Sequence, residues 1–284
     1  MILITGATGN IGRRTAELLS EQGRQLRLMV RDSAKAPRLS GAEAVRGDYS
    51  DPLTLDAAFA GIETALIVSG YARPGDRALL HKNAFDAAAR AGVSHLVYLS
   101  FQGAAPDSKF PMSRDHYQSE QYLRESGVPF TALRDNLYLD LMPEMFDANG
   151  VMRGPAGQGK AALISREDVT RVAAAVLSGP VGSGATHDVT GPEALTMIET
   201  ARRLSALVGR ELHYEEESVE EGRRWRSQTV APDWEVETWL GSYEAIAAGE
   251  LEQTSDTVLR ITGSQPFDLE AYFTARPQLL NHLR

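Results

Sequence analysis

Short apolar runs alternate with longer stretches of helical periodicity along the first half of the chain. The runs predict buried strands at 2–4, 26–30, 65–68, 95–99 and 130–133, with a shorter one near Ala44 and Val45. After the first of these strands, apolar residues recur at helical spacing, beginning with Ile11, Thr15 and Leu18. This order of elements predicts an α/β fold with a doubly wound, Rossmann-type sheet that is mostly parallel.

Turn and cap residues support the same division into helices. Glycines follow the predicted helices, at Gly23, Gly61, Gly92 and Gly127. Asp51 followed by Pro52 predicts a helix start, because Asp is a favoured N-cap and proline fits the first turn. Further helices are predicted at 76–91 and 113–126.

The alternation becomes irregular beyond about residue 136. We expect residues 1–150 to form a dinucleotide-binding domain, with 165–190 returning to it as a helix capped by Asp168 and a last strand at 187–189. Residues 191–284 are predicted to form a smaller, mostly helical lobe on the substrate side. The acidic run from Glu215 to Glu221 is interpreted as a solvated face.

Composition excludes several classes of function. The net charge is -9, which has the wrong sign for a protein that binds nucleic acid or an anionic membrane. With no cysteine, disulfides, thiolate metal sites and thiol catalysis are excluded. The six histidines are scattered without metal-ligand spacing, so no metal is expected. The first residues already look like a strand rather than a signal peptide, and a cytoplasmic protein is expected.

The strongest chemical signal is the segment TGATGNIG at 5–12, between the first strand and the first helix. Gly6 permits a tight turn, Gly9 lets the backbone approach a pyrophosphate, and Gly12 lets the helix pack on the sheet. The helix N-terminus then offers free N–H groups to the anion. We therefore predict dinucleotide binding by this loop, including Thr8, Asn10 and Ile11, although a glycine-rich turn without a ligand is the alternative.

The end of the second strand bears on which dinucleotide is bound. An acidic residue there would hold the ribose hydroxyl of NAD, but this strand ends in Arg31. Arg31, with Lys35 one turn later, favours a 2′-phosphate and hence NADP(H) over NAD(H). Asp32 is open to two interpretations, as a helix cap or as a ribose ligand.

Ligands of such sheets lie across the carboxyl ends of the strands. Asp48 is therefore expected to contact the adenine, and Ser69, Gly70 and Ser100 to line the path toward the nicotinamide. Each of them also suits an ordinary turn.

The glycine-rich segment at 5–12 and the strand-end residues named above carry a family resemblance. Two later segments carry it as well, HYQSEQYLRESGVPFTALRDNLYLD from His116 and WLGSYEAIAAGEL from Trp239. The chain resembles the NmrA-like group of atypical short-chain dehydrogenase/reductases, and within it the type-two NADPH-dependent quinone oxidoreductases and triphenylmethane reductase. The resemblance covers nearly the whole length. It implies an oxidoreductase that reduces a quinone, a dye or a similar conjugated acceptor in a cleft beside a small C-terminal lobe.

Catalysis departs from the usual short-chain pattern. In place of a Tyr-x-x-x-Lys pair, Tyr117 is followed four residues later by Gln121, and a neutral amide cannot lower a tyrosine pKa. The resemblance instead puts His116 and Glu120 in the motif, one helical turn apart. They are candidates for catalysis or for an ion pair or packing pair.

We therefore expect direct hydride transfer from NADPH to the acceptor without covalent catalysis. Asn136 and Tyr138 are predicted to orient the acceptor. Met142, Phe146 and Met152 are open to interpretation as its apolar wall or as plain core.

Two other functions compete. A catalytically inactive dinucleotide sensor that regulates a protein partner suits the missing lysine. A sugar-nucleotide epimerase or carbonyl reductase is disfavoured by the same absence. The oligomeric state and the physiological acceptor do not follow from the sequence.

Overall fold

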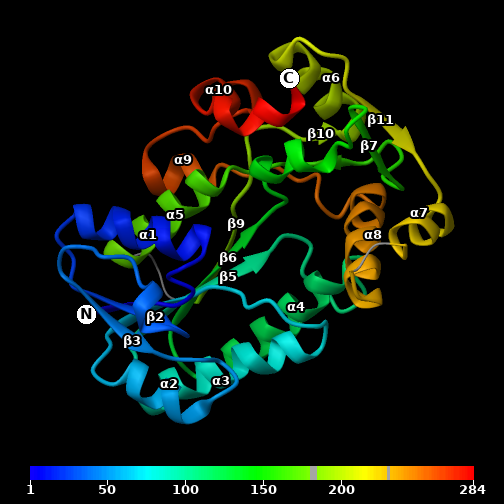
Figure 1. The fold of residues 1–284 in the computed structure, drawn as a ribbon. Coiled ribbons are helices and arrows are strands. Elements are labelled where there is room, and N and C mark those ends of the chain that lie inside the picture. Colours follow the sequence, from blue (N-terminus) through cyan, green and yellow to red (C-terminus); the bar gives the residue numbers. More distant parts are fainter. Residues whose placement is uncertain (180–183, 229–230) are drawn as a thin grey trace.

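A computed structural model describes residues 1–179, 184–228 and 231–284. Its centre is a seven-stranded sheet in the order β3-β2-β1-β4-β5-β6-β9, in which every neighbouring pair is parallel (Figure 1). The strands are β1 (Ile2–Ile4), β2 (Leu26–Val30), β3 (Ala42–Arg46), β4 (Thr64–Ile67), β5 (His95–Phe101), β6 (Phe130–Asp135) and β9 (Ala185–Asp188). The predicted doubly wound fold is confirmed.

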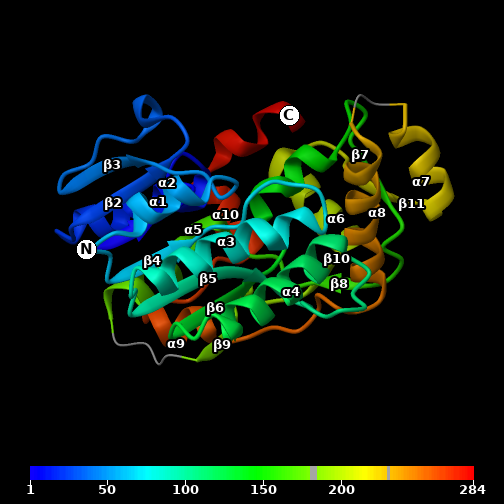
Figure 2. The same ribbon diagram turned by 90° about the horizontal axis from the view of Figure 1, so that it is seen from below.

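Helices cover both faces of this sheet, as Figures 1 and 2 show from two directions. One face carries α1 (Asn10–Glu21), α5 (Arg166–Ser178) and α9 (Thr257–Thr262), and the other carries α2 (Pro52–Phe59), α3 (Asp76–Arg90) and α4 (Pro111–Glu125). Because parallel strands need crossover helices, this layering follows directly from the alternating order of the elements.

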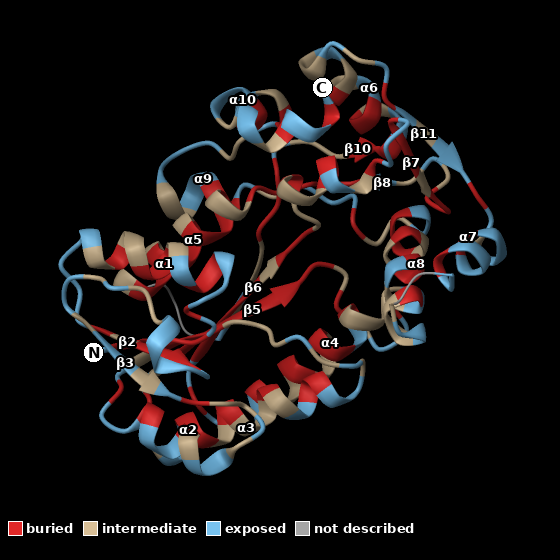
Figure 3. Ribbon diagram, viewed as in Figure 1, coloured by how far each residue is buried: buried red, intermediate tan, exposed pale blue. Residues whose placement is uncertain are grey.

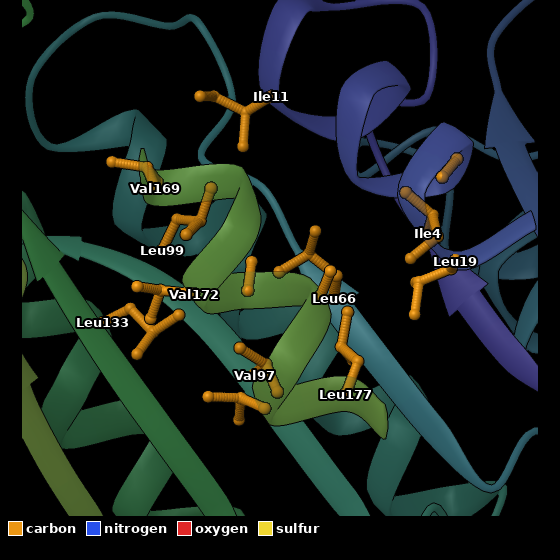
Figure 4. Close-up of a cluster of buried hydrophobic side chains, with 14 of the residues drawn as sticks. Ile4, Ile11, Leu19, Leu66, Val97, Leu99, Leu133, Val169, Val172 and Leu177 are labelled. Carbon is orange, nitrogen blue, oxygen red and sulfur yellow. The ribbon is translucent and has the colours of Figure 1, made fainter. Parts of the chain in front are cut away.

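The central strands β1, β4, β5 and β6 are buried on both sides, and alternate residues serve the two helical layers, whereas the edge strands β3 and β9 are exposed or half-buried. Ile4, Leu66 and Val97 contribute to the core beneath α1 and α5, which also includes Val172 (Figure 4). Their sequence neighbours, such as Leu3, contribute to the core beneath α2 and α3. In Figure 3 the central strands are accordingly almost continuously buried. Burial on both faces explains why the strands read as apolar runs without polar alternation.

The remaining segments surround a third core beside the carboxyl ends of β5 and β6. Two small sheets lie here, one joining β7 (Val151–Gly154) to β11 (His213–Glu216) and the other joining β8 (Lys160–Ala161) to β10 (Leu195–Thr196). The helices of this part are α6 (Met197–Val208), α7 (Val219–Arg226), α8 (Asp233–Ala247) and α10 (Leu269–Ala275). The division of the chain at residue 191 stays a prediction.

One local expectation was wrong and a second holds only in part, since Glu215, Glu216, Glu220 and Glu221 are exposed as expected of the acidic run but Glu217 is not. The N-cap of α5 is Ser165, whose Oγ accepts from the N–H of Asp168 at 3.0 Å, so Asp168 lies inside the first turn. Within the acidic run, Glu217 is buried rather than solvated, because it pairs with the buried guanidinium of Arg226. The pairing of Ser165 with Asp168 has a local sequence pattern, whereas that of Glu217 with Arg226 has none, because the two residues lie at opposite ends of α7.

The last strand is β9, close to the predicted 187–189, and it pairs with β6. Within the described ranges no helix is long and apolar enough to cross a membrane.

Candidate functional site

The order of the strands reverses between β1 and β4, and the loops that follow these two strands border a crevice at that point. Gly6 in the loop after β1 has a φ of +57°, which favours glycine. A Cβ on Gly12 would lie 2.4 Å from the carbonyl oxygen of Gly6. The loop therefore keeps its tight course because these positions lack side chains.

The N-terminus of α1 has the features of an anion site. Its N-cap is Gly9, no side chain caps it, and the first turn contains no acidic residue. Its first N–H groups are therefore left for a ligand, in the positive field of the helix dipole. This arrangement fits the pyrophosphate of a dinucleotide.

A cavity of about 360 Å³ extends from this loop toward the ends of β2 and β3. Gly6, Thr8 and Gly9 line it, whereas Asn10 and Gly12 do not. Ile11 lines a second cavity described below.

The far end of the first cavity is where an adenosine would lie. Arg31 and Asp48 line it, but Lys35 does not. Asp32 accepts from the N–H of Ala34 at 3.0 Å and caps the short 3₁₀ segment Ser33–Lys35, which confirms the cap interpretation. The cation, rather than the neighbouring carboxylate, therefore faces the ligand space.

Asp48 is held for binding as an anion. Its Oδ1 accepts from the N–H of Ser50 at 2.9 Å and from the Ser50 hydroxyl at 2.7 Å, and these bonds lower the pKa of the Asp48 carboxyl. Its other oxygen remains for a donor such as an exocyclic amine.

A second cavity of about 490 Å³ continues past the ends of β4, β5 and β6. Ser69 and Gly70 line both cavities, so the two spaces adjoin at the loop after β4. Ser100 also lines the second cavity, but its hydroxyl donates to Glu120 Oε1 at 2.7 Å. The two cavities therefore adjoin along the strand ends, and the predicted path of the nicotinamide along them stays a prediction.

Two buried histidines and a tyrosine lie behind the second cavity. His81 Nε2 accepts from the N–H of Gly70 at 3.1 Å, and His116 Nε2 lies 3.0 Å from Nη2 of Arg77. Since an amide and a guanidinium only donate, the proton of each imidazole resides on Nδ1. Both Nδ1 atoms lie near the hydroxyl of Tyr98, at 3.1 and 2.9 Å.

Burial and the neighbouring Arg77 hold the pKa of His81 and of His116 well below the ordinary value. Both rings are therefore neutral at neutral pH, and burial raises the pKa of Tyr98 to about 12. His116 lines the second cavity as a neutral hydrogen-bonding group.

Arg77 joins the two sides of the site. Its Nε donates to the carbonyl oxygen of Gly70 at 2.8 Å, while Nη2 contacts His116 on α4. The side chain is buried and lines the second cavity. It places a fixed positive charge at the cavity floor.

Glu120 lies apart from the cavities. Its carboxylate is fully buried and accepts from Nε and Nη2 of Arg134 at 2.7 and 2.8 Å. Burial by itself would raise the pKa of Glu120, but the bonds from Arg134 and Ser100 leave it lowered. Glu120 therefore forms a buried ion pair with Arg134 and not a surface pair with His116, and Tyr117 likewise lines neither cavity.

Asp135, the last residue of β6, lines the second cavity and is 5% exposed. The hydroxyl of Tyr138 donates to its Oδ2, and the guanidinium of Arg166 lies 4.9 Å from the centre of the Tyr138 ring. Burial raises the pKa of Asp135 to about 7, although Tyr138, Arg77 and Arg166 act in the opposite direction.

Asn136 also borders this cavity, but its amide is committed elsewhere. Its Nδ2 donates to the carbonyl oxygen of Leu251 at 2.9 Å and to the side chain of Gln102. Asn136 thereby ties the end of β6 to the C-terminal part of the chain. Tyr138, two residues further along the chain, also lines this cavity.

An apolar cavity of about 300 Å³ adjoins the second one, and we call it the apolar chamber. The two share Tyr71, Phe110, Met112, Leu137 and Leu141. Of the three residues considered for an apolar wall, Met142 lines the chamber, whereas Phe146 and Met152 are buried core residues that do not.

Sequence reasoning missed Asp135, Arg77, Arg166 and Tyr98. Asp135 had a usable signal, because it ends a strand whose neighbours end at the same edge of the sheet. Arg77 and Tyr98 had none, since each acts through contacts with distant segments.

Comparisons with known proteins agree with this geometry. The profile of the NAD(P)H-binding family matches residues 6–180. A (4-alkanoyl-5-oxo-2,5-dihydrofuran-3-yl)methyl phosphate reductase from Streptomyces griseus is 35% identical over 274 residues, which cover 94% of this chain and 95% of that protein.

Two solved structures are similar over nearly the whole length. NADPH-dependent quinone oxidoreductase from Escherichia coli in complex with NADPH has a TM-score of 0.89 at 30% identity and covers 97% of this chain and 99% of that one. Triphenylmethane reductase from Citrobacter sp. in complex with NADP(H) has a TM-score of 0.86 at 29% identity, covering 97% and 100%.

The transcriptional regulator NmrA, in complex with NAD, has a TM-score of 0.77 at 16% identity over 100% of this chain and 99% of that one. At that identity the likeness concerns the fold alone.

Proposed function

The chain belongs to the NAD(P)H-binding family, and we propose that it transfers hydride from NADPH to a conjugated organic acceptor such as a quinone or a dye. It is an NAD(P)H-dependent oxidoreductase, in keeping with the reductases to which it is similar over its full length. The geometry of the site supports NADPH as the cofactor and a conjugated compound as the acceptor.

One observation carries the proposal. Two cavities adjoin along the carboxyl ends of the parallel strands and share Ser69 and Gly70. The first begins at an uncapped helix N-terminus and has the elongated course that a dinucleotide needs. The second lies where the nicotinamide end would emerge, and it opens to the apolar chamber, which suits a flat, poorly hydrated acceptor.

The choice of NADPH is supported by Arg31 and Asp32. Arg31 lines the adenosine end of the first cavity, whereas Asp32 is used in its own turn. A guanidinium at this place stabilises a 2′-phosphate, and no carboxylate of the turn competes for the ribose. The structures of two relatives contain NADPH or NADP(H).

The residues of the chain position the reactants. The N–H groups of α1 and the side chain of Arg31 would hold the cofactor, which supplies the hydride when bound. Arg77 and His81 fix the loop at Gly70 from behind, and the chamber side chains exclude water from the acceptor. No covalent intermediate with the protein is needed.

The direct test is steady-state oxidation of NADPH by the purified chain with a naphthoquinone and with a cationic triphenylmethane dye. We expect turnover with at least one of them. Tight binding of NADPH in calorimetry without turnover of either acceptor would contradict the proposal and favour a dinucleotide sensor instead.

A further inference from the structure

We propose that Asp135 is the general acid of this site, and that the site therefore accepts neutral conjugated carbonyl compounds, quinones or α,β-unsaturated ketones and lactones, whose reduced forms need a proton. This inference rests on the proposed function and names its substrate class more closely. It also assigns a proton donor in a site that lacks the Tyr-x-x-x-Lys pair.

The position of Asp135 suits direct contact with an acceptor. It lies at the carboxyl end of β6, faces the cavity that adjoins the cofactor space, and is nearly inaccessible to bulk water. Because the hydroxyl of Tyr138 donates to Oδ2, the proton of the neutral acid resides on Oδ1. Tyr138 is therefore a positioning residue, since its own proton is committed to Asp135.

Four charged or titratable side chains from three helices and the loop after β6 lie around Asp135. They are Arg77 on α3, the neutral His116 on α4, Arg166 at the start of α5 and Tyr138 after β6. Burial keeps the carboxyl protonated up to about pH 7, where its pKa lies. The two guanidinium groups then stabilise the carboxylate that forms when the proton leaves, so both states of the acid are supported.

The balance of the step is simple. A hydride, which carries two electrons and is supplied by the cofactor, forms a bond to the acceptor and leaves an enolate or a phenolate. The O–H bond of Asp135 breaks, and its proton goes to that oxygen or to the adjacent carbon. Asp135 regains a proton from water after the product leaves. A cationic dye differs, since hydride addition neutralises it and no proton is taken up.

The experiment compares these two kinds of acceptor in wild type and in Asp135→Asn, across pH 5.5–9. With a naphthoquinone we expect kcat of the variant to fall by about 100-fold. In wild type the rate with the quinone should fall above about pH 7, as the acid is lost. The variant should lack this break, and its ratio of quinone rate to dye rate should fall by at least about tenfold.

Asp188→Asn is the matched control. Asp188 ends the neighbouring strand β9 and burial raises the pKa of its carboxyl too, but it does not line the cavity. It should keep both the quinone rate and the pH break of wild type. Equal losses with dye and quinone in Asp135→Asn, or an unchanged pH break, would overturn the assignment.

A readout independent of turnover is the infrared absorption of protonated carboxyl groups. Wild type should lose one such band as the pH rises through about 7, and Asp135→Asn should not show this loss. Inactivity of wild type toward both acceptors contradicts the proposed function itself. Activity of wild type with a missing infrared titration contradicts only the role of Asp135.

Discussion

At the residue scale, the cofactor loop depends on two glycines for different reasons. A Cβ on Gly12 would meet the Gly6 carbonyl oxygen at 2.4 Å, whereas one on Gly9 would lie 3.4 Å from that atom, in ordinary contact. The absence of a side chain at Gly12 therefore allows the helix to pack against the loop. At Gly9 it is expected to leave room for the ligand.

We accordingly expect Gly12→Ala to lower the free energy of unfolding by about 1–3 kcal/mol, because the backbone must shift. Gly9→Ala should unfold within about 0.5 kcal/mol of wild type, yet bind NADPH at least about tenfold more weakly. Urea unfolding and calorimetric titration measure the two effects. Normal NADPH affinity in Gly9→Ala would show that the backbone of this loop does not approach the ligand.

Arg31 lines the first cavity, and we propose that discrimination between the two nicotinamide cofactors depends on it. We expect Arg31→Ala to raise the Kd of NADPH by about tenfold or more, because a charge-assisted hydrogen bond is lost. The Kd of NADH should change by less than about twofold. Arg38→Ala removes a cation that lies outside the cavity and serves as the control. A preference of wild type for NADH would reject the assignment.

The raised pKa of Asp135 also implies that the free energy of unfolding depends on pH. Its pKa rises from about 3.9 in the unfolded chain to about 7 in the fold. The folded state therefore binds the proton more tightly, and this contribution to stability is present below about pH 4 and lost as the pH rises through 7. The free energy of unfolding of Asp135→Asn minus that of wild type should therefore increase by on the order of 2–4 kcal/mol between pH 4 and pH 8. Unfolding in urea at both pH values measures it, and parallel curves would contradict the assigned titration.

At the element scale, helix starts differ in what holds them. Ser165 caps α5 through its side chain and also donates to Asp168, whereas Asp51 precedes α2 without a side-chain bond to the helix. Both residues are of capping type, so sequence alone gives them equal weight.

Ser165→Ala should therefore lower the free energy of unfolding by about 1–2 kcal/mol, and Asp51→Ala by less than about 0.5 kcal/mol. Thermal or urea unfolding of the two variants provides the comparison. Equal losses would mean that the bond at Ser165 contributes nothing beyond the general preference for polar caps.

The element scale also shows why strands were predicted better than the site. A buried parallel strand is recorded in its own residues as an apolar run, as in β5. The tie between Asn136 and Leu251, by contrast, joins segments separated by 115 positions. Such contacts leave no periodic signal, so the hydrogen bonds that the Asn136 amide makes to Leu251 and Gln102 could not be predicted, and its role toward an acceptor stays a prediction.

At the scale of the whole molecule, the doubly wound parallel sheet was predictable from the alternation of strands and helices, because connection rules leave few arrangements for it. The packing of α9 on α5 was not, since a six-residue helix carries too short a pattern to reveal its partner. Gly6, Arg31 and Asp48, which were predicted as cofactor ligands, line the first cavity, whereas Asn10, Gly12 and Lys35 do not. The second was foreseen in place but not in chemistry, because Arg77 and Asp135 act through burial.

Binding of the cofactor should stabilise the entire fold, since the loop after β1 and the first cavity exist only in the folded chain. At a concentration of NADPH about 100 times its Kd, linkage gives about 2.7 kcal/mol, which corresponds to a rise in Tm of about 5 °C. Thermal scanning with and without NADPH measures this shift. Gly9→Ala, which is expected to bind NADPH more weakly, should shift less at the same concentration, and an unchanged Tm in wild type would contradict cofactor binding.

The shared contacts of Arg77 bear on how such a protein can diversify. One side chain supports both the loop at Gly70 and the ring of His116, so a substitution there disturbs the two halves of the site together. Leu141 and Met145 contribute apolar surface to the chamber. We therefore expect substitutions of these chamber residues to change the preferred acceptor while leaving the contacts of Arg77 with Gly70 and His116 intact.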